Sequence, residues 1–297
     1  MAASLNERER QVLEAVIETY VETAEPAGSR TVSKRFGLDL SPASIRNTMS
    51  DLEEKGYLYH PHTSAGRIPT DLAYRVYVNS LMRLPPVSAS ESHQIREGLG
   101  DHNAVDQILE RAAQVLGVLT KELGVAIGPT LDAAVLERLA GLTLREIRGT
   151  LPERLRDATP DADSSELLNI FIQEADDLFD MPTAGNAGVG VVLGSAQLLA
   201  GQPEFATKER LQGLMEVTER RDMLREALAQ RLGQGLTITI GGEHHDARLA
   251  PFTLVTASYR LGALAGVIGV MGPTRMPYDK IVALVEHTSR LVGELLE

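Results

Sequence analysis

Helix start and stop signals in the first 60 residues constrain the fold of this chain more than any other feature. Glu25-Pro26-Ala27-Gly28 ends a first amphipathic segment, Gly37 ends a second, and Ser41-Pro42 starts a third that stops at Gly56. Ser at an N-cap followed by Pro is typical of a helix start, and Gly is common just past a helix end. The signals therefore predict helices over residues 6–23, 29–36 and 42–55.

Apolar spacing supports each of these helices. Ser4 and Glu7 have the spacing of a capping box for the first helix, and Ser29 is a suitable cap for the second. The apolar residues of the first helix recur every three or four positions: Val12, Leu13, Val16, Ile17, Tyr20 and Val21. The third helix has a narrower stripe, predicted to be buried: Ile45, Met49 and Leu52.

The next residues have the pattern of a β-hairpin followed by another helix. Residues 57–60 and 68–70 are predicted strands, residues 61–67 form a small polar loop, and residues 71–83 form a helix. Two helices joined by a tight turn and followed by a hairpin define a winged helix-turn-helix, in which the hairpin is the wing. The prediction for residues 1–84 is thus a DNA-binding domain, although winged modules also mediate contacts between proteins alone.

A recognition helix places its first turns in the major groove, so the polar residues beside the buried stripe are the candidate readers. Arg pairs with guanine and Asn with adenine, which makes Arg46 and Asn47 the candidates for base contacts. Phosphate contacts are predicted for the basic residues of the second helix. The remaining candidate DNA-binding residues are Arg30, Lys34, Arg35, Ser41, Ser44 and Ser50 in the helices, and His62, Thr63, Ser64 and Arg67 in the wing.

Charge is distributed unevenly along the chain. The net charge of the 297 residues is −12, yet residues 26–83 carry 8 basic and 5 acidic residues. Local potential governs an encounter with a polyanion, so this basic segment agrees with double-stranded DNA as the partner. The chain has no Cys, which excludes thiolate metal sites and fits a reducing compartment. We therefore expect a cytoplasmic protein that is associated with the nucleoid and not with a membrane.

No catalytic constellation is evident in the sequence. It has no P-loop and no Gly-x-Ser-x-Gly elbow, and His60-x-His62 lacks a third ligand type. The spacing Gly188-x-Gly190-x-x-x-Gly194 does not fit a dinucleotide-binding loop. We expect neither enzyme activity, nor a cofactor, nor a metal site.

Four segments resemble the HrcA-type heat-inducible transcription repressors. The recognition-helix segment 41–53 with Gly56-Tyr57-Leu58 and the wing segment 61–71 carry the resemblance at one end. Residues 267–278 resemble a second signature of the family, and Gln202-Pro203-Glu204-Phe205 a third. The resemblance implies a homodimer that represses chaperone operons by binding an inverted-repeat operator called CIRCE. It also implies release from the operator on heat stress and a GroEL-type chaperonin as a partner.

The family architecture implied is a winged helix, a GAF-like α+β domain and a mainly helical dimerisation region inserted into the latter. On this chain it corresponds to residues 1–84, a linker at 85–91, a GAF-like domain at 92–132 and 186–297, and an insertion at 133–185. The insertion is short, because no strands precede its helical part (133–139, 167–179). The GAF-like domain is predicted to contain helices 101–123, 207–219, 222–232 and 279–296 and strands 189–193, 236–240, 252–259 and 263–270. Because GAF-like folds often bind small molecules, a ligand-gated winged-helix regulator is the alternative function.

Overall fold

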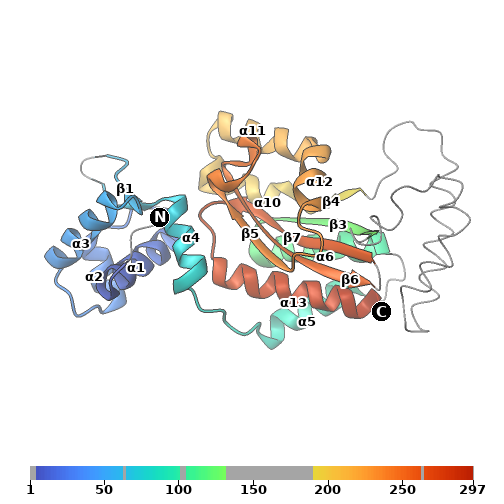
Figure 1. Cartoon of the computed structure of the whole chain (residues 1–297), viewed down its shortest axis with the longest axis horizontal. Coiled ribbons are helices and arrows are strands. Elements are labelled where there is room, and N and C mark those ends of the chain that lie inside the picture. The colour runs from blue at the N-terminus through green and yellow to red at the C-terminus, as the bar shows by residue number, and fades with distance from the viewer. Residues whose placement is uncertain (1–4, 63–64, 101–104, 132–189, 262–263, 297) are drawn as a thin grey trace, which may run out of the picture. The chain divides into compact units, whose positions relative to one another are not determined.

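The computed structural model describes residues 5–62, 65–100, 105–131, 190–261 and 264–296, which form a mixed helix-and-sheet protein (Figure 1). This confirms the predicted α+β class. The chain divides into two compact units. The first consists of Met1–Pro86, Ile238–Leu254 and Gly272–Ala283, and the second of Val87–Thr237, Val255–Met271 and Leu284–Glu297. The predicted insertion at 133–185 lies outside the described residues, and the predicted domain boundaries stay a prediction.

Helix α1 spans Glu7–Thr23, nearly as predicted, but its cap differs from the prediction. The Asn6 side chain accepts a hydrogen bond from the Glu9 amide at 2.9 Å, and the Glu9 carboxylate accepts one from the Asn6 amide at 3.0 Å. The capping box is therefore Asn6 with Glu9, whereas Ser4 lies outside the described residues. Asn and Ser cap equally well, and both Ser4 and Asn6 have a Glu three positions later. Spacing alone therefore does not choose between them.

Helices α2 (Ser29–Phe36) and α3 (Pro42–Glu54) follow at the predicted positions. The prediction that Ser29 caps α2 is wrong: Ser29 is the first helical residue, and the cap is Gly28, which has no side chain to bond. The cap of α3 is confirmed, because the Ser41 hydroxyl accepts the Ser44 amide at 3.1 Å. Gly37 and Gly56 end the two helices with φ of +55° and +80°, a backbone conformation that favours glycine.

A two-stranded antiparallel hairpin follows α3. Strand β1 (Leu58–Tyr59) pairs with β2 (Ile68–Pro69), and Leu58 lies opposite Pro69. The single helix predicted for 71–83 is instead α4 (Asp71–Val76) continued by a π-helical turn (Tyr77–Leu81). Helix α5 (Ala89–Leu99) begins within the predicted linker, because Ser88 and Glu91 form a capping box there.

A half-buried ion pair ties α1 to the end of α3. The Lys55 ammonium lies 2.8 Å from both carboxylate oxygens of Glu9, a residue only 5% exposed. The bond from Lys55, together with the Asn6 amide, lowers the pKa of Glu9 below its ordinary value of 4.5 despite burial. The pair therefore stabilises the fold at neutral pH.

We expect Glu9→Gln to lower the free energy of unfolding by ~2 kcal/mol at pH 7, because a charge-assisted bond is lost and Lys55 keeps no carboxylate. The pKa of Glu9 is lower in the folded than in the unfolded chain. The stabilisation by ionised Glu9 is thus complete above pH 4.5, the ordinary pKa. It is lost as the pH falls through the pKa that Glu9 has in the folded protein. Urea unfolding of wild type and variant from pH 7 to pH 3 measures this. Glu7→Gln, an exposed change in the same helical turn, is the control; a gap between wild type and Glu9→Gln that does not narrow as the pH falls below 4.5 contradicts the assignment.

The larger of the two sheets has five strands, in the order β4-β3-β7-β6-β5. Strands β5 (Leu236–Ile240), β6 (Phe252–Leu261) and β7 (Leu264–Pro273) confirm the predicted positions within a few residues, as does β4 (Val191–Leu193). Strand β3 (Leu123–Leu131) was not predicted, and it pairs antiparallel with both β4 and β7. The helix predicted for 101–123 is α6 (Val105–Thr120), which ends where β3 is about to begin.

The remaining helices follow the sequence pattern closely. Three of them confirm the predicted positions: α11 (Lys208–Glu219), α12 (Arg221–Ala229) and α13 (Tyr278–Leu296). The short helix α10 (Ala196–Ala200) was not predicted.

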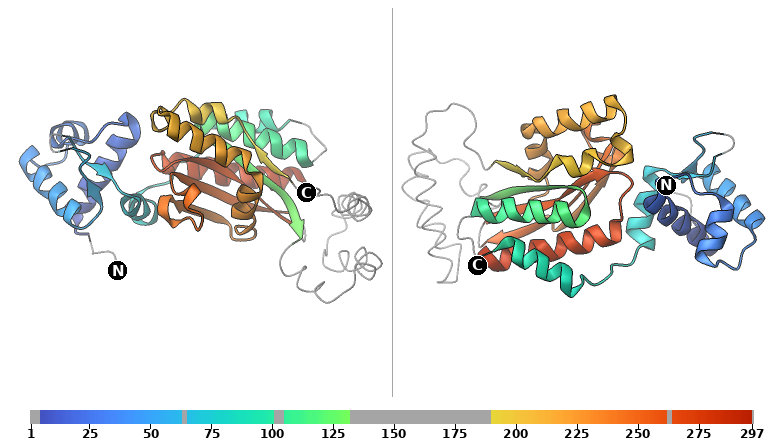
Figure 2. Two further views of the ribbon diagram at one scale, coloured as in Figure 1. Left: turned by 90° about the horizontal axis from the view of Figure 1, so that it is seen from above. Right: turned by 180° about the vertical axis from the view of Figure 1, so that it is seen from behind.

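Helix α6 runs along β3 at very short range (Figure 2). A Cβ atom on Gly124 of β3 would lie 1.8 Å from the carbonyl oxygen of Ala113 in α6. The backbones meet here without an intervening side chain, so this position requires glycine.

Candidate nucleic-acid interface

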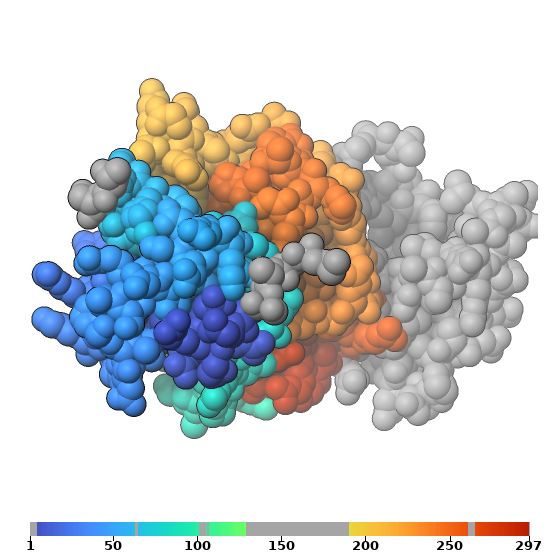
Figure 3. Space-filling view, turned by 60° about the vertical axis from the view of Figure 1, so that its left-hand side comes forward, coloured from blue at the N-terminus to red at the C-terminus, as the bar shows by residue number. Residues whose placement is uncertain are grey.

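Helix α3 buries one face and exposes the other, as the sequence predicts. Ile45, Met49 and Leu52 are at most 3% exposed and pack toward α1 and α2. Arg46 and Asn47 are exposed on the opposite side of the helix. The N-terminal residues present a broad surface to solvent (Figure 3). The two residues predicted to contact bases are therefore both accessible.

The three serines of this helix are engaged in local hydrogen bonds. Ser41 and Ser44 share a bond between their hydroxyl groups at 3.1 Å, and Ser50 donates to the Arg46 carbonyl at 3.2 Å. A hydroxyl group has one donor and two acceptor positions, and these bonds leave at least one of the three available on each serine. They therefore do not remove the serines from contact with a ligand.

The basic residues of α2 differ in their surroundings. Arg30 and Lys34 are exposed. Arg35 forms an ion pair with Glu22 and lies 5.6 Å from the centre of the Phe36 ring. Glu22 balances part of the Arg35 charge, which leaves Arg30 and Lys34 as the better candidates for phosphate contacts.

Arg67 lies in different surroundings from His62, another predicted wing residue. His62 is exposed, and Thr63 and Ser64 lie outside the described residues. Arg67, however, is only 9% exposed, and its guanidinium lies 2.8 Å from the Glu53 carboxylate at the end of α3. Glu53 therefore balances the Arg67 charge inside the protein, and the contact of Arg67 with DNA stays a prediction. The sequence shows the charge of Arg67, but not that the Glu53 carboxylate pairs with it.

Two residues at this place were missed by sequence reasoning. Glu53 also bonds to Nδ1 of His60 at 2.9 Å, so one carboxylate contacts both ends of the hairpin. A hollow of ≈ 510 Å³ lies beside them, and Gly28, Arg30, Arg46, Ser50 and His60 contribute to its lining. The signal available in the sequence was a carboxylate one turn before the predicted wing, a common spacing that does not single out Glu53.

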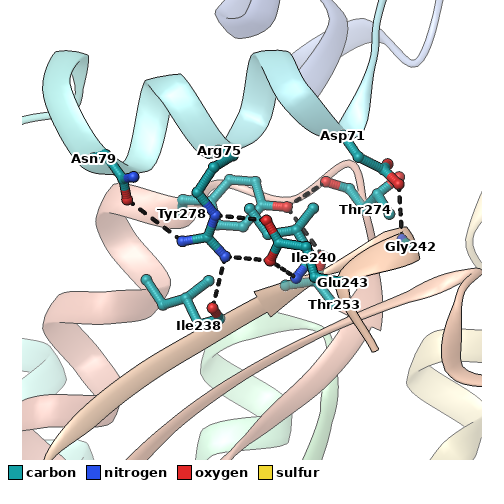
Figure 4. A network of polar contacts seen from close by, with 10 residues as sticks. All are labelled: Asp71, Arg75, Asn79, Ile238, Ile240, Gly242, Glu243, Thr253, Thr274 and Tyr278. Atoms are coloured by element: carbon teal, nitrogen blue, oxygen red, sulfur yellow. Dashed lines mark hydrogen bonds and ion pairs between the residues drawn. The ribbon is translucent and has the colours of Figure 1, made fainter. Parts of the chain in front are cut away.

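A second polar network fixes α4 within the first unit (Figure 4). Arg75 donates from Nε to Glu243 at 2.7 Å and from an η nitrogen to the Ile238 carbonyl at 2.7 Å. The Gly242 amide donates to Asp71 at 2.9 Å. Burial disfavours the charge on Glu243, but the bonds from Arg75 and the Ile240 amide outweigh it and leave the pKa of Glu243 below its ordinary value.

Aromatic packing accompanies this network. The rings of Tyr74 and Tyr278 lie 5.6 Å apart, and the Tyr278 hydroxyl donates to the Thr274 carbonyl at 2.7 Å. No sequence pattern predicts this contact, since Tyr74 and Tyr278 are separated by about two hundred positions. The network explains why the first unit includes two segments from the C-terminal part of the chain.

Within the described ranges no group of three or more His, Asp or Glu side chains is arranged to hold a metal ion. None of the helices that the structure describes is both long and apolar enough to cross a bilayer.

Comparison with known proteins gives a consistent picture. A family model described as "HrcA protein C terminal domain" matches residues 133–282. The "Heat-inducible transcription repressor HrcA" of Geobacter sulfurreducens is 33% identical, covering 99% of this chain and 98% of its own. The protein of the same name from Chlorobium phaeobacteroides is 34% identical over 97% of each chain. A crystal structure described as a hypothetical protein shares the fold, with a TM-score of 0.63, 20% identity and 99% coverage of both chains.

The α+β fold and these relatives define a transcription repressor. The chain belongs to the HrcA family of heat-inducible transcription repressors. The family suggested by the sequence segments is thereby confirmed.

Proposed function

We propose that this chain represses chaperone operons by binding an inverted-repeat CIRCE-type operator through an N-terminal winged helix-turn-helix. The observation that carries the proposal is the geometry of α3, which buries Ile45, Met49 and Leu52 and exposes Arg46 and Asn47. Helices α2 and α3 form the helix-turn-helix, and the β1–β2 hairpin is the wing. The names of the relatives support repression that responds to heat.

The proposal includes a homodimer with a GAF-like domain. One winged helix contacts few base pairs, so specific binding needs two copies about one DNA turn or a multiple of it apart. An inverted repeat matches such a two-fold arrangement. Heat then acts through the marginal stability of a folded protein, since a small change in free energy strongly shifts the active fraction. A GroEL-type chaperonin that restores the active state and a nucleoid location in the cytoplasm complete the proposal.

The test separates base readout from phosphate contact. We expect Arg46→Ala to reduce the preference for an inverted-repeat duplex over a scrambled one by roughly tenfold or more, because a bidentate contact to guanine is lost. Lys34→Ala should weaken binding to both duplexes alike and lower the salt slope by about one. Fluorescence anisotropy at several salt concentrations measures both quantities.

The control variant is Arg225→Ala, which removes the same charge from α12 in the second unit and should leave both affinities unchanged. Equal effects of Arg46→Ala and Lys34→Ala on the two duplexes contradict the assigned roles. A wild-type protein that binds neither duplex at low salt contradicts the proposed function.

The alternative function is a ligand-gated regulator. A hollow of ≈ 590 Å³ lies between β6 and α13, and Arg260, Glu286, Arg290 and Glu294 are part of its lining. Ligand sites are mostly enclosed and apolar, with a few polar groups that orient the ligand. These four lining residues are charged, exposed and of balanced sign, so the repressor without a small-molecule ligand is the better supported proposal.

A further inference from the structure

One carboxylate joins the recognition helix to the residues on both sides of the hairpin loop. Glu53 lies in the last turn of α3, and its two oxygens contact different partners. Oε1 lies 2.9 Å from Nδ1 of His60, just after β1, and Oε2 lies 2.8 Å from the guanidinium of Arg67, just before β2. The hairpin is therefore held at its base, on both sides of its loop.

The residues just before β2 are also held against the turn that precedes α2. Ala27 and Arg67 exchange two backbone hydrogen bonds of 2.9 Å each. Gly66 passes so close to this turn that a Cβ atom would lie 2.4 Å from the Ala27 carbonyl. Arg67 thus belongs to a fixed junction of three elements: α3, the hairpin and the turn before α2.

We propose that Glu53 is a positioning residue for DNA binding, which acts through Arg67 and His60 to hold the wing at a fixed place beside the recognition helix. This inference rests on the proposed function. A protein that contacts DNA with two elements at once gains affinity only if both are held in register before binding, because ordering them during binding costs free energy.

Simple electrostatics predicts the opposite result, which makes the inference testable. A carboxylate near the DNA surface repels phosphates, so its removal should strengthen binding to any duplex. Its removal would also release the Arg67 guanidinium for a contact with DNA and steepen the salt dependence. If Glu53 positions the wing, its removal instead weakens binding.

The experiment compares Glu53→Ala with Glu54→Ala. Glu54 is the next residue of α3, is exposed, and carries the same charge, so the two variants match in net charge and helix propensity. We expect Glu53→Ala to lower affinity for an inverted-repeat duplex about tenfold, the effect of losing one good contact, without steepening the salt slope. Glu54→Ala should leave the affinity unchanged or raise it slightly. A protein that is only less well folded shows a smaller active fraction in a stoichiometric titration, whereas a misplaced wing raises the Kd at full stoichiometry. The stoichiometry therefore distinguishes positioning from stability.

Two further measurements keep the test decisive. Glu53→Gln, which preserves the shape of the side chain, serves if Glu53→Ala fails to fold. In an Arg67→Met background the effect of Glu53→Ala should shrink, because residues that act as a unit are not additive. Equal binding by Glu53→Ala and Glu54→Ala, or tighter binding by Glu53→Ala, overturns the inference while the proposed function stands. Absence of wild-type binding to every duplex overturns the proposed function itself.

Discussion

Replacing Gly66 by alanine is expected to lower the affinity for an inverted-repeat duplex by about 30-fold or more, equivalent to ~2 kcal/mol. The new methyl group would lie 2.4 Å from the carbonyl carbon and oxygen of Ala27 and 2.5 Å from the carbonyl oxygen of Pro26. These are backbone atoms, which cannot rotate away as a side chain does. The hairpin must therefore leave the turn, which breaks the two Ala27–Arg67 backbone bonds and displaces Arg67 from Glu53.

Gly28→Ala is the matched control for this prediction. Gly28 borders the same hollow, but a Cβ atom there would meet only the Thr31 hydroxyl oxygen, at an ordinary 3.7 Å. Binding titrations together with hydrogen exchange at the Ala27 and Arg67 amides measure the effect. If Gly66→Ala exchanges these amides no faster than Gly28→Ala does, the junction between hairpin and turn is not as tight as described.

The part of the site that sequence could predict is the part governed by local rules. The Ser41 cap, the buried face of α3 and the stop at Gly56 each depend on residues within a few positions of one another. Arg67 shows where local rules fail. Its charge favours DNA contact, but a partner fourteen positions away in the chain and an antiparallel bridge to Ala27 bury it. Pairing between distant residues leaves no periodic signal in a single sequence.

In the fold, too, the elements set by local patterns could be predicted and those set by tertiary contacts could not. Helices α11 and α13 have regular apolar spacing and were predicted nearly to the residue. Strand β3 was missed because Gly124, Gly128 and Pro129 are poor strand formers when judged one by one. In the folded protein Gly124 is favourable, since it admits α6 against the strand. A tertiary contact thus reverses the meaning of a residue that local propensity counts as a breaker.

Gly124→Ala should accordingly be among the most destabilising single substitutions in the second unit. A methyl group 1.8 Å from the Ala113 carbonyl oxygen and 3.0 Å from its Cα would force α6 away from β3. We expect a loss of ~3 kcal/mol, because the overlap is with backbone atoms of α6, and a fall in melting temperature of about 5 °C for a chain of this size. Circular dichroism melting measures it. Gly213→Ala in α11, where a Cβ atom meets nothing within 4 Å, is the control and should be neutral or slightly stabilising.

This substitution also tests how heat reaches the DNA-binding end of the proposed repressor. Gly124 lies in the second unit and Arg46 in the first, so the substitution alters no candidate DNA contact. If release from the operator follows loss of the folded protein, Gly124→Ala should bind the inverted repeat normally at low temperature and release it about 5 °C earlier than wild type does. Release at the wild-type temperature, in a variant that melts earlier, would separate DNA binding from the stability of the sheet. Heat sensing would then have to reside in the first unit, where the Glu9–Lys55 pair and the Arg75–Glu243 network supply the polar contacts to test next.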